Sequence, residues 1–167
     1  MPITIRPLAK IDDRSEFACG EPALDEWFQR RAGQDERRHL ARVFVAVDET
    51  PQILGFYSLS SYTVTLTELS PELARKLPRY EAIPAALIGR LARDQRAHGH
   101  GVGSLLLVDA IRRIIKLSET IAIFAIVVEA KNDRAAAFYE PFGFTRSAEK
   151  SMRLYLPLAT AVQAFAP

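Results

Sequence analysis

Alternating hydrophobic and polar residues predict β-strands in the first third of the chain. Residues 3–8 alternate and end at a proline, and residues 42–47 and 53–62 form two further apolar, β-branched runs. A polar turn with a proline, residues 48–52, separates these two runs. Two such runs joined by a short turn predict an antiparallel hairpin.

Between the first strand and the hairpin, the apolar positions change to a helical period. A helix is predicted over residues 21–31, where four side chains share one face: Leu24, Trp27, Phe28 and Arg31. The pattern continues, with a break near Gly33, through a basic segment to about residue 40.

The second half alternates strands with helices. Residues 84–91 and 121–128 are short apolar runs typical of buried strands. Residues 102–118 between them form a helical pattern with one apolar stripe: Leu106, Ala110, Ile114 and Leu117. A strand, a helix and a second strand in this order predict a right-handed βαβ unit with parallel strands.

Shorter elements complete the prediction. The long polar connection of residues 63–83 is expected to contain a short helix at 71–77. Residues 133–140 read as another short helix, and residues 145–149 and 152–156 as a final hairpin. There are no internal repeats, so we expect one domain spanning residues 1–167.

Composition is typical of a soluble globular protein. The chain has 167 residues, of which 49% are hydrophobic and 25% charged. No apolar run reaches the roughly 18 residues that span a bilayer, and the first residues lack the order of a signal peptide. The single cysteine, Cys19, cannot form an internal disulfide, so the expected location is the cytoplasm without membrane attachment.

Charge is uneven although the net charge is only +2. Residues 29–42 and residues 72–96 each carry an excess of three positive charges, while the remainder is net acidic. Two basic segments of this kind are either a surface that attracts a polyanion or two solvated faces.

The glycine loop, residues 96–104, is the most informative stretch. It places Gly99, Gly101 and Gly103 at alternate positions after Arg96, between a predicted strand and a predicted helix. Backbone N–H groups of residues 95–104 and the positive end of the helix dipole favour a phosphate-bearing ligand. The alternative is a mere helix entry.

Two common phosphate sites do not fit. A P-loop needs Gly-Lys followed by Ser or Thr, which the chain lacks. A dinucleotide fingerprint needs glycine where Ser104 stands and an acidic residue about 20 positions later, at the end of the next strand. The next predicted strand, residues 121–128, only begins about 20 positions after the loop, so the acidic residue cannot stand at its end.

The loop instead resembles the acetyl-CoA loop of the GNAT acyltransferase superfamily. Arg96-Ala97-His98-Gly99-His100-Gly101 matches its pattern Gln/Arg-x-x-Gly-x-Gly/Ala. Residues 127–144 resemble its second signature, with a strand, Asn132, a short helix, then Phe138-Tyr139 and Gly143-Phe144. The resemblance implies an α/β fold whose mixed central sheet, flanked by helices, splays between two parallel strands that end near Leu91 and Val128.

The same resemblance implies a catalytic role for Tyr139 and acetyl-CoA as the acetyl donor. A phenol of pKa about 10 is protonated at neutral pH and can protonate a departing thiolate. The alternative is a core aromatic. The cofactor-binding set comprises Leu91, Ala92, Arg93, Arg96, Ala97, His98, Gly99, His100, Gly101, Val102, Gly103, Ser104, Asn132 and Phe138.

Within this set the strand end, residues 91–93, is expected to pair with the pantetheine arm and polarise the thioester through a backbone N–H. Arg96 either adds charge or caps a neighbouring surface, and Asn132 either contacts pantetheine or caps a helix. We expect no metal site, because His98 and His100 have no carboxylate cluster beside them and Cys19 is remote in sequence. Cys19 is expected to be structural.

Further segments resemble one GNAT subgroup, the toxins of bacterial toxin–antitoxin pairs: residues 17–20, 24–25, 55–60, 77–80, 83–84 and 89–92. This implies acetylation of the α-amine of aminoacyl-tRNA, a ribbon-helix-helix antitoxin and a homodimer. The basic segments would then hold tRNA through Arg30, Arg31, Arg37, Arg38, Arg42, Arg75, Lys76, Arg79 and Arg90.

The acceptor amine is open on chemical grounds. An α-amine of pKa about 7.7–8.0 is partly free at neutral pH, whereas a lysine amine of pKa about 10.4 benefits from a base. No obvious base is present, although a water chain or Glu129 remains possible. Alternative functions are acetylation of a small amine or a protein N-terminus, and a non-catalytic partner module that binds CoA.

Overall fold

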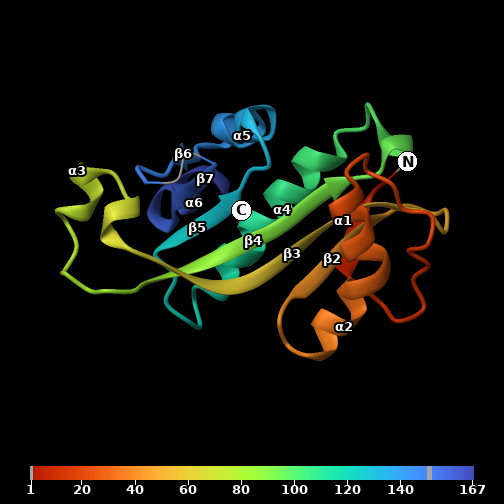
Figure 1. The fold of residues 1–167 in the computed structure, drawn as a ribbon, viewed down its shortest axis with the longest axis horizontal. Helices are drawn as coiled ribbons and strands as arrows, with labels where there is room; N and C mark the ends of the chain where they lie inside the picture. The colour runs from red at the N-terminus through yellow and green to blue at the C-terminus, as the bar shows by residue number, and fades with distance from the viewer. Residues whose placement is uncertain (1, 150–151) are drawn as a thin grey trace. The chain divides into compact units, whose positions relative to one another are not determined.

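The computed structural model describes residues 2–149 and 152–167, whose strands form one mixed seven-stranded sheet in the order β1-β2-β3-β4-β5-β7-β6 (Figure 1). The chain forms two compact units. Unit 1 comprises Met1–Ser60 and Gly89–Ala110, and unit 2 comprises Ser61–Ile88 and Ile111–Pro167. No helix in the described parts is long and apolar enough to cross a bilayer.

The antiparallel start of the sheet agrees with the sequence. In unit 1, β1 (Thr4–Pro7) pairs with β2 (Arg42–Val47), which pairs in turn with β3 (Ile53–Val64). The predicted hairpin is therefore confirmed. Strand β3 was expected to end at residue 62 but continues for two more residues, to Val64. Its last residues belong to unit 2.

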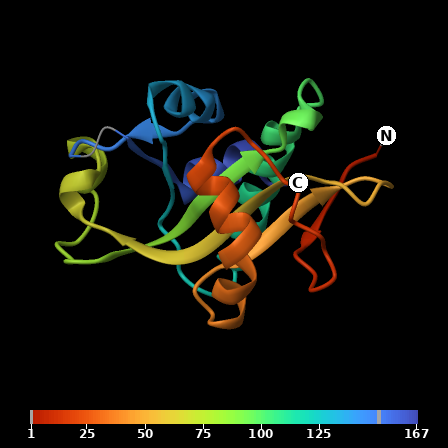
Figure 2. The same ribbon diagram turned by 45° about the vertical axis from the view of Figure 1, so that its right-hand side comes forward.

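The helical layer of unit 1 corrects one prediction. The chain forms α1 (Pro22–Glu26), a π-helical turn η1 (Trp27–Arg31) and α2 (Ala32–Arg37) (Figure 2). The irregularity therefore lies before Gly33, which is inside α2. The wider π turn presents neighbouring side chains to the same partner: Phe28 and Trp27 both stack on Phe56, at centroid distances of 4.1 and 5.9 Å.

The end of this layer was also predicted too late. The helix stops at Arg37 rather than near residue 40. His39 then adopts a positive φ of 61°, which an α-helix does not allow. The aromatic side chains of η1 pack against β2 and β3, and with Phe17 they form the core of unit 1.

The βαβ unit is confirmed. β4 (Ile83–Arg93) and β5 (Ala125–Glu129) run parallel and are connected through α4 (Val102–Leu117). Their register ends at Ile88 and Val128, although β4 continues to Arg93. The pairing stops there because β5 itself ends at Glu129, and the expected splay between the two strands stays a prediction.

Strand β5 begins at Ala125 rather than at residue 121. Residues after the end of α4 still donate to its last carbonyls: Ser118 N–H to Ile114 and Ile121 N–H to Leu117. Because those amides complete the helix end, they are not available to a strand ladder.

The remaining elements of unit 2 are short. They are η2 (Leu66–Glu68), α3 (Pro71–Ala74), α5 (Asp133–Tyr139), η4 (Glu140–Phe142), β6 (Thr145–Arg146), β7 (Arg153–Pro157) and α6 (Leu158–Phe165). Helix α3 is shorter than predicted, and α6 was not predicted. β7 lies antiparallel between β5 and β6.

The final hairpin exists with shifted bounds. Its first strand was predicted over residues 145–149 but has only two residues, because the Ala148 N–H donates to the Glu68 carbonyl rather than to β7. Its second strand begins at Arg153, one residue late. Residues 150–151 of the predicted turn lie outside the described residues.

Candidate active site

The glycine loop of unit 1 is a tight turn between β4 and α4. A short 3-10 helix, η3 (Gln95–Ala97), starts it, and Gly99 and Gly101 then adopt φ values of +86° and +67°. A Cβ built on either glycine would meet no atom within 4 Å. These glycines are therefore required by backbone conformation, and the space beside them is open.

Hydrogen-bond accounting separates used from available amides in the loop. The N–H groups of residues 95–98 and His100 all donate to oxygens nearby, for example Gln95 to the Ala18 carbonyl at 2.9 Å. Leu105 makes the first bond of the helix, to the Gly101 carbonyl at 3.1 Å. Within the described chain no acceptor is assigned to five amides: Gly99, Gly101, Val102, Gly103 and Ser104.

We call these five N–H groups the amide row. The sequence predicted that all amides of residues 95–104 are available to bind phosphate, and the structure leaves only the amide row available. Four of them are consecutive and lie at the start of α4, whose dipole is positive there. The imidazoles of His98 and His100 are exposed. The amide row can hold an anion through directional hydrogen bonds.

A second glycine, Gly55 on β3, positions the start of α4. A Cβ there would lie 2.8 Å from the Ala92 carbonyl, 2.8 Å from a Leu106 methyl and 3.0 Å from a Val102 methyl. The missing side chain thus lets the first turns of α4 pack directly against β3 and β4. In the sequence Gly55 is only one position of the segment 55–60, because nothing in the sequence reveals a contact of this closeness.

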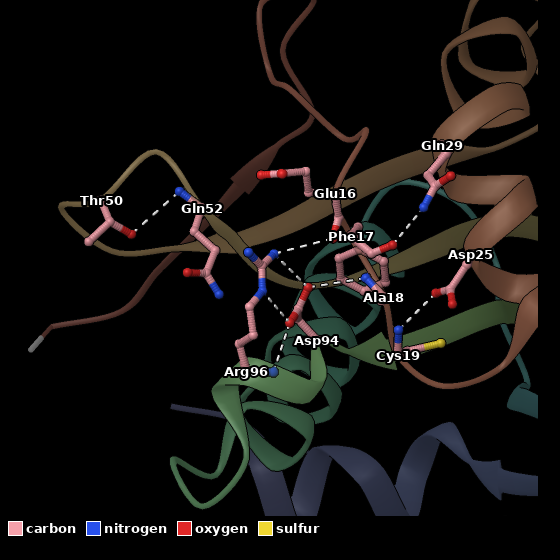
Figure 3. Close-up of polar contacts among 10 residues, drawn as sticks. All are labelled: Glu16, Phe17, Ala18, Cys19, Asp25, Gln29, Thr50, Gln52, Asp94 and Arg96. Atoms are coloured by element: carbon pink, nitrogen blue, oxygen red, sulfur yellow. Dashed lines mark hydrogen bonds and ion pairs between the residues drawn. The ribbon is translucent and has the colours of Figure 1, made fainter.

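The loop is also held by an ion pair that sequence analysis missed. Asp94 is fully buried and pairs with Arg96, Nε to Oδ1 at 3.0 Å (Figure 3). Arg96 thus uses Nε and Nη2 on this carboxylate. Its predicted contact with a phosphate would have to use the remaining nitrogen of the guanidinium.

The strand end predicted to bind pantetheine lies at the end of β4 in unit 1. Leu91 and Arg93 are half-buried, and Ala92 belongs to the aromatic core. The predicted contact of this strand with pantetheine stays a prediction.

Tyr139 lies at the end of α5 in unit 2. It is 7% exposed and packs edge-to-face on Phe138 and Phe144, at centroid distances of 5.1 and 5.7 Å. Burial raises its pKa from 10.0 to about 12. Its surroundings therefore keep the phenol neutral, and among the described residues no hydrogen-bond partner is assigned to its hydroxyl.

Asn132 is a helix cap. Its Oδ1 accepts the Ala135 N–H at 2.9 Å and so completes the first turn of α5. The side-chain amide nitrogen remains on an exposed residue. Capping through Oδ1 and donation to a ligand through the nitrogen are therefore compatible.

Glu129, the possible base, is ion-paired. Arg153 reaches it through Nη2 at 3.1 Å and reaches buried Glu68 through Nη1 at 2.6 Å. The Glu129 side chain is nevertheless 52% exposed.

Eight of the nine cationic residues predicted to bind tRNA are exposed: Arg30, Arg31, Arg37, Arg38, Arg42, Arg75, Lys76 and Arg79. The first five belong to unit 1 and the last three to unit 2. Arg90 differs, since its guanidinium lies 4.0 Å from the centroid of the Trp27 ring. Burial lowers the pKa of Arg90 and the charge of Asp35 opposes this shift.

In the described parts of the chain, no three histidine, cysteine, aspartate or glutamate side chains gather as a metal site would require. Cys19 is half-buried, and its backbone N–H donates to Asp25 at 2.8 Å.

Comparison with known proteins places the chain among acetyltransferases. The profile of the acetyltransferase (GNAT) family matches residues 6–144. A tRNA-acetylating toxin of Mycobacterium tuberculosis is 35% identical over 156 residues, covering 93% of this chain and 92% of that protein. A probable toxin TacT of Sinorhizobium fredii is 32% identical, covering 89% and 86%.

Solved structures agree closely. A tyrosine-to-phenylalanine variant of KacT has a TM-score of 0.91 and 30% identity, covering 99% of this chain and 100% of that one. AtaT complexed with acetyl-methionyl-tRNAfMet has a TM-score of 0.90, 30% identity and the same coverage. A tyrosine-to-phenylalanine variant of AtaT, bound to the C-terminus of the antitoxin AtaR and acetyl-CoA, has a TM-score of 0.82 and 26% identity, covering 99% of each chain.

Proposed function

Because the chain belongs to the acetyltransferase (GNAT) family, we propose that it moves the acetyl group of acetyl-CoA to the α-amine of an aminoacyl-tRNA and so blocks translation. The structural observation that carries the proposal is the amide row of Gly99 and residues 101–104. These five N–H groups have no acceptor assigned within the described chain, four of them lie at the start of α4, and together they suit the pyrophosphate of CoA. The fold and its solved relatives support the same cosubstrate.

Acetyl-CoA supplies an activated acetyl thioester. A backbone N–H at the end of β4, residues 91–93, would polarise its carbonyl and stabilise the oxyanion. Tyr139 would give its proton to the departing sulfur, while the attacking nitrogen loses a proton as the amide forms. The proton released by the amine returns to the Tyr139 phenol, so the enzyme ends unchanged. The products are the N-acetylated amine and the free thiol of CoA.

The neutral state of Tyr139 suits this role. With a pKa of about 12 the phenol is protonated throughout the physiological range. A thiol of ordinary pKa, about 8.5, is a stronger acid than this phenol. The phenol therefore acts first as a hydrogen-bond donor to the developing thiolate, and full transfer is driven by the proton that the amine releases.

The choice of acceptor rests on the relatives and on charge. A relative at 35% identity is a tRNA-acetylating toxin, and AtaT has been solved with acetyl-methionyl-tRNA. Exposed arginines of α2 and its neighbours, such as Arg37 and Arg38, suit a phosphate backbone.

By the same reasoning we propose the partners and location. The chain would be neutralised by an antitoxin of ribbon-helix-helix type, would form a homodimer and would act in the cytoplasm, where charged tRNA is found. Antitoxin complexes of AtaT support the first of these.

Mass spectrometry of a pool of charged tRNAs, incubated with the protein and acetyl-CoA, tests the proposal. N-acetyl-aminoacyl-tRNA should form, and Tyr139→Phe should form it at least about a hundredfold more slowly. Acetylation of free amines or peptide N-termini alone would replace tRNA as the acceptor. Binding of CoA without transfer to any amine would leave a non-catalytic module and refute the proposal.

A further inference from the structure

We propose that Asp94 is a positioning residue for acetyl-CoA: its carboxylate holds the amide row in place by tying the glycine loop to the segment of residues 16–19. The inference rests on the proposed function, since it concerns the same cosubstrate. Asp94 itself is 0% exposed. It therefore acts through the loop rather than by touching phosphate.

The Asp94 carboxylate accepts hydrogen bonds from two parts of unit 1, the glycine loop and the 16–19 segment. It accepts the Arg96 backbone N–H at 2.8 Å and both Nε and Nη2 of Arg96 at 3.0 Å (Figure 3). It also accepts the Ala18 N–H at 3.2 Å, across 76 residues of sequence. Burial raises the pKa of Asp94, but the hydrogen bonds from Arg96 and Ala18 outweigh it and the pKa is lowered overall.

Further bonds fix the same junction. The Asp94 N–H donates to the Leu54 carbonyl of β3 at 2.8 Å, and the Gln95 N–H donates to the Ala18 carbonyl at 2.9 Å. Arg96 Nη2 also approaches the Glu16 carbonyl at 3.4 Å. The base of the loop is thus held between a central strand and the 16–19 segment.

The 16–19 segment is itself anchored to the helical layer. Phe17 is 2% exposed and packs on Phe28 and Phe56. Its carbonyl accepts Gln29 Nε2 at 2.6 Å, and the Cys19 N–H donates to Asp25 at 2.8 Å (Figure 3). Asp94 therefore connects the glycine loop to a rigid part of the unit.

This connection has a functional consequence. A loop with two positive-φ glycines is flexible unless its base is fixed. If the loop must be ordered by the ligand, the ordering cost reduces affinity. Loss of Asp94 should therefore weaken binding of CoA while leaving the chemistry of the bound complex nearly unchanged.

Calorimetric titration with CoA and steady-state kinetics test this in Asp94→Asn. We expect Kd for CoA and KM for acetyl-CoA to rise about tenfold, the scale of a lost charged hydrogen bond with Arg96. The rate at saturating acetyl-CoA should change less than about twofold. Asp12→Asn is the matched control, because Asp12 forms a similar two-bond pair with Arg6, at 2.8 and 2.9 Å, outside the loop.

An unchanged Kd in Asp94→Asn, or an equal rise in Asp12→Asn, would overturn the proposal. Hydrogen exchange of the wild-type chain gives a second test that needs no variant. CoA should slow exchange at the amides of Ala18 and Gln95, and absence of slowing contradicts the coupling. Failure of the proposed function is distinguishable, since in that case the wild-type protein either does not bind CoA or binds it without acetylating tRNA.

Discussion

Arg90 lies over the indole ring of Trp27, with its guanidinium carbon 4.0 Å from the ring centroid. The indole N–H donates in turn to Asp35 Oδ2 at 2.9 Å. These three residues come from β4, η1 and α2, so the stack connects the helical layer of unit 1 to its sheet. Arg90 therefore has a structural role in unit 1 as well as a charge.

This stack leads to a prediction that separates Arg90 from Arg38. Arg90→Gln should lower the free energy of unfolding by about 1 kcal/mol, because a cation–π contact is lost. Arg38→Gln, at an exposed position, should leave stability unchanged but reduce the slope of log affinity for tRNA against log salt by about 0.7–0.9, the value for one phosphate contact. Urea unfolding and filter binding at several salt concentrations measure both. If Arg90→Gln also reduces the salt dependence of tRNA binding, Arg90 contacts the tRNA and its role is not only structural.

Tyr139 should make the protein lose stability at high pH. Its pKa is about 12 in the fold and about 10 in the unfolded chain. Below pH 10 the phenol is protonated in both the folded and the unfolded chain, so the contribution of Tyr139 to the free energy of unfolding is fully present. Above pH 10 the unfolded chain ionises first, so the free energy of unfolding falls by roughly 1 kcal/mol by about pH 11.

Urea unfolding of the wild type and of Tyr139→Phe at about pH 8 and pH 11 checks this. The difference between the two proteins should shift in favour of the variant at the higher pH, because phenylalanine has no proton to lose. An identical difference at both values would mean that the phenol ionises in the fold as easily as in the unfolded chain.

Asn132 offers a test of its two possible roles. Asn132→Ala should destabilise the protein by about 1 kcal/mol through loss of the cap on the Ala135 N–H. Asn132→Asp keeps the capping oxygen and should retain stability. If the side-chain nitrogen also donates to pantetheine, Asn132→Asp raises Kd for CoA; if Asn132 only caps α5, Kd is unchanged. Thermal melts and calorimetric titration distinguish these outcomes.

Gly55→Ala should disturb the glycine loop by displacing the start of α4, which follows the loop. The new Cβ would lie 2.8 Å from the Ala92 carbonyl, which cannot swing away as a flexible side chain can. We expect a loss of about 1–3 kcal/mol from overpacking, together with weaker binding of CoA as the start of α4 shifts. Gly33→Ala is the control, since a Cβ there meets only arginine side-chain ends at 3.3–3.4 Å. Equal effects of the two changes on CoA binding would contradict the assigned role of Gly55.

The sequence by itself determined the features that depend on neighbouring residues. The glycines of the loop, the Asn132 cap and the alternation of strands and helices are local, because turns and helices are closed by bonds between residues three or four apart. The motif of residues 96–101 and the signature of residues 127–144 were therefore sufficient to recognise the family, and it is this resemblance that points to Tyr139.

Only the tertiary structure decided which of these local groups remain available for a ligand. Ala18 and Asp94 meet across 76 residues, and Arg90 finds Trp27 from another element. Contacts of this kind depend on how buried surfaces pack, which periodicity does not encode. The loop was predicted as ten equivalent amides. Four of them donate within the turn, to residues 94–97, and the long-range contact with Ala18 takes the Gln95 amide, which leaves Gly99 and residues 101–104 for an anion.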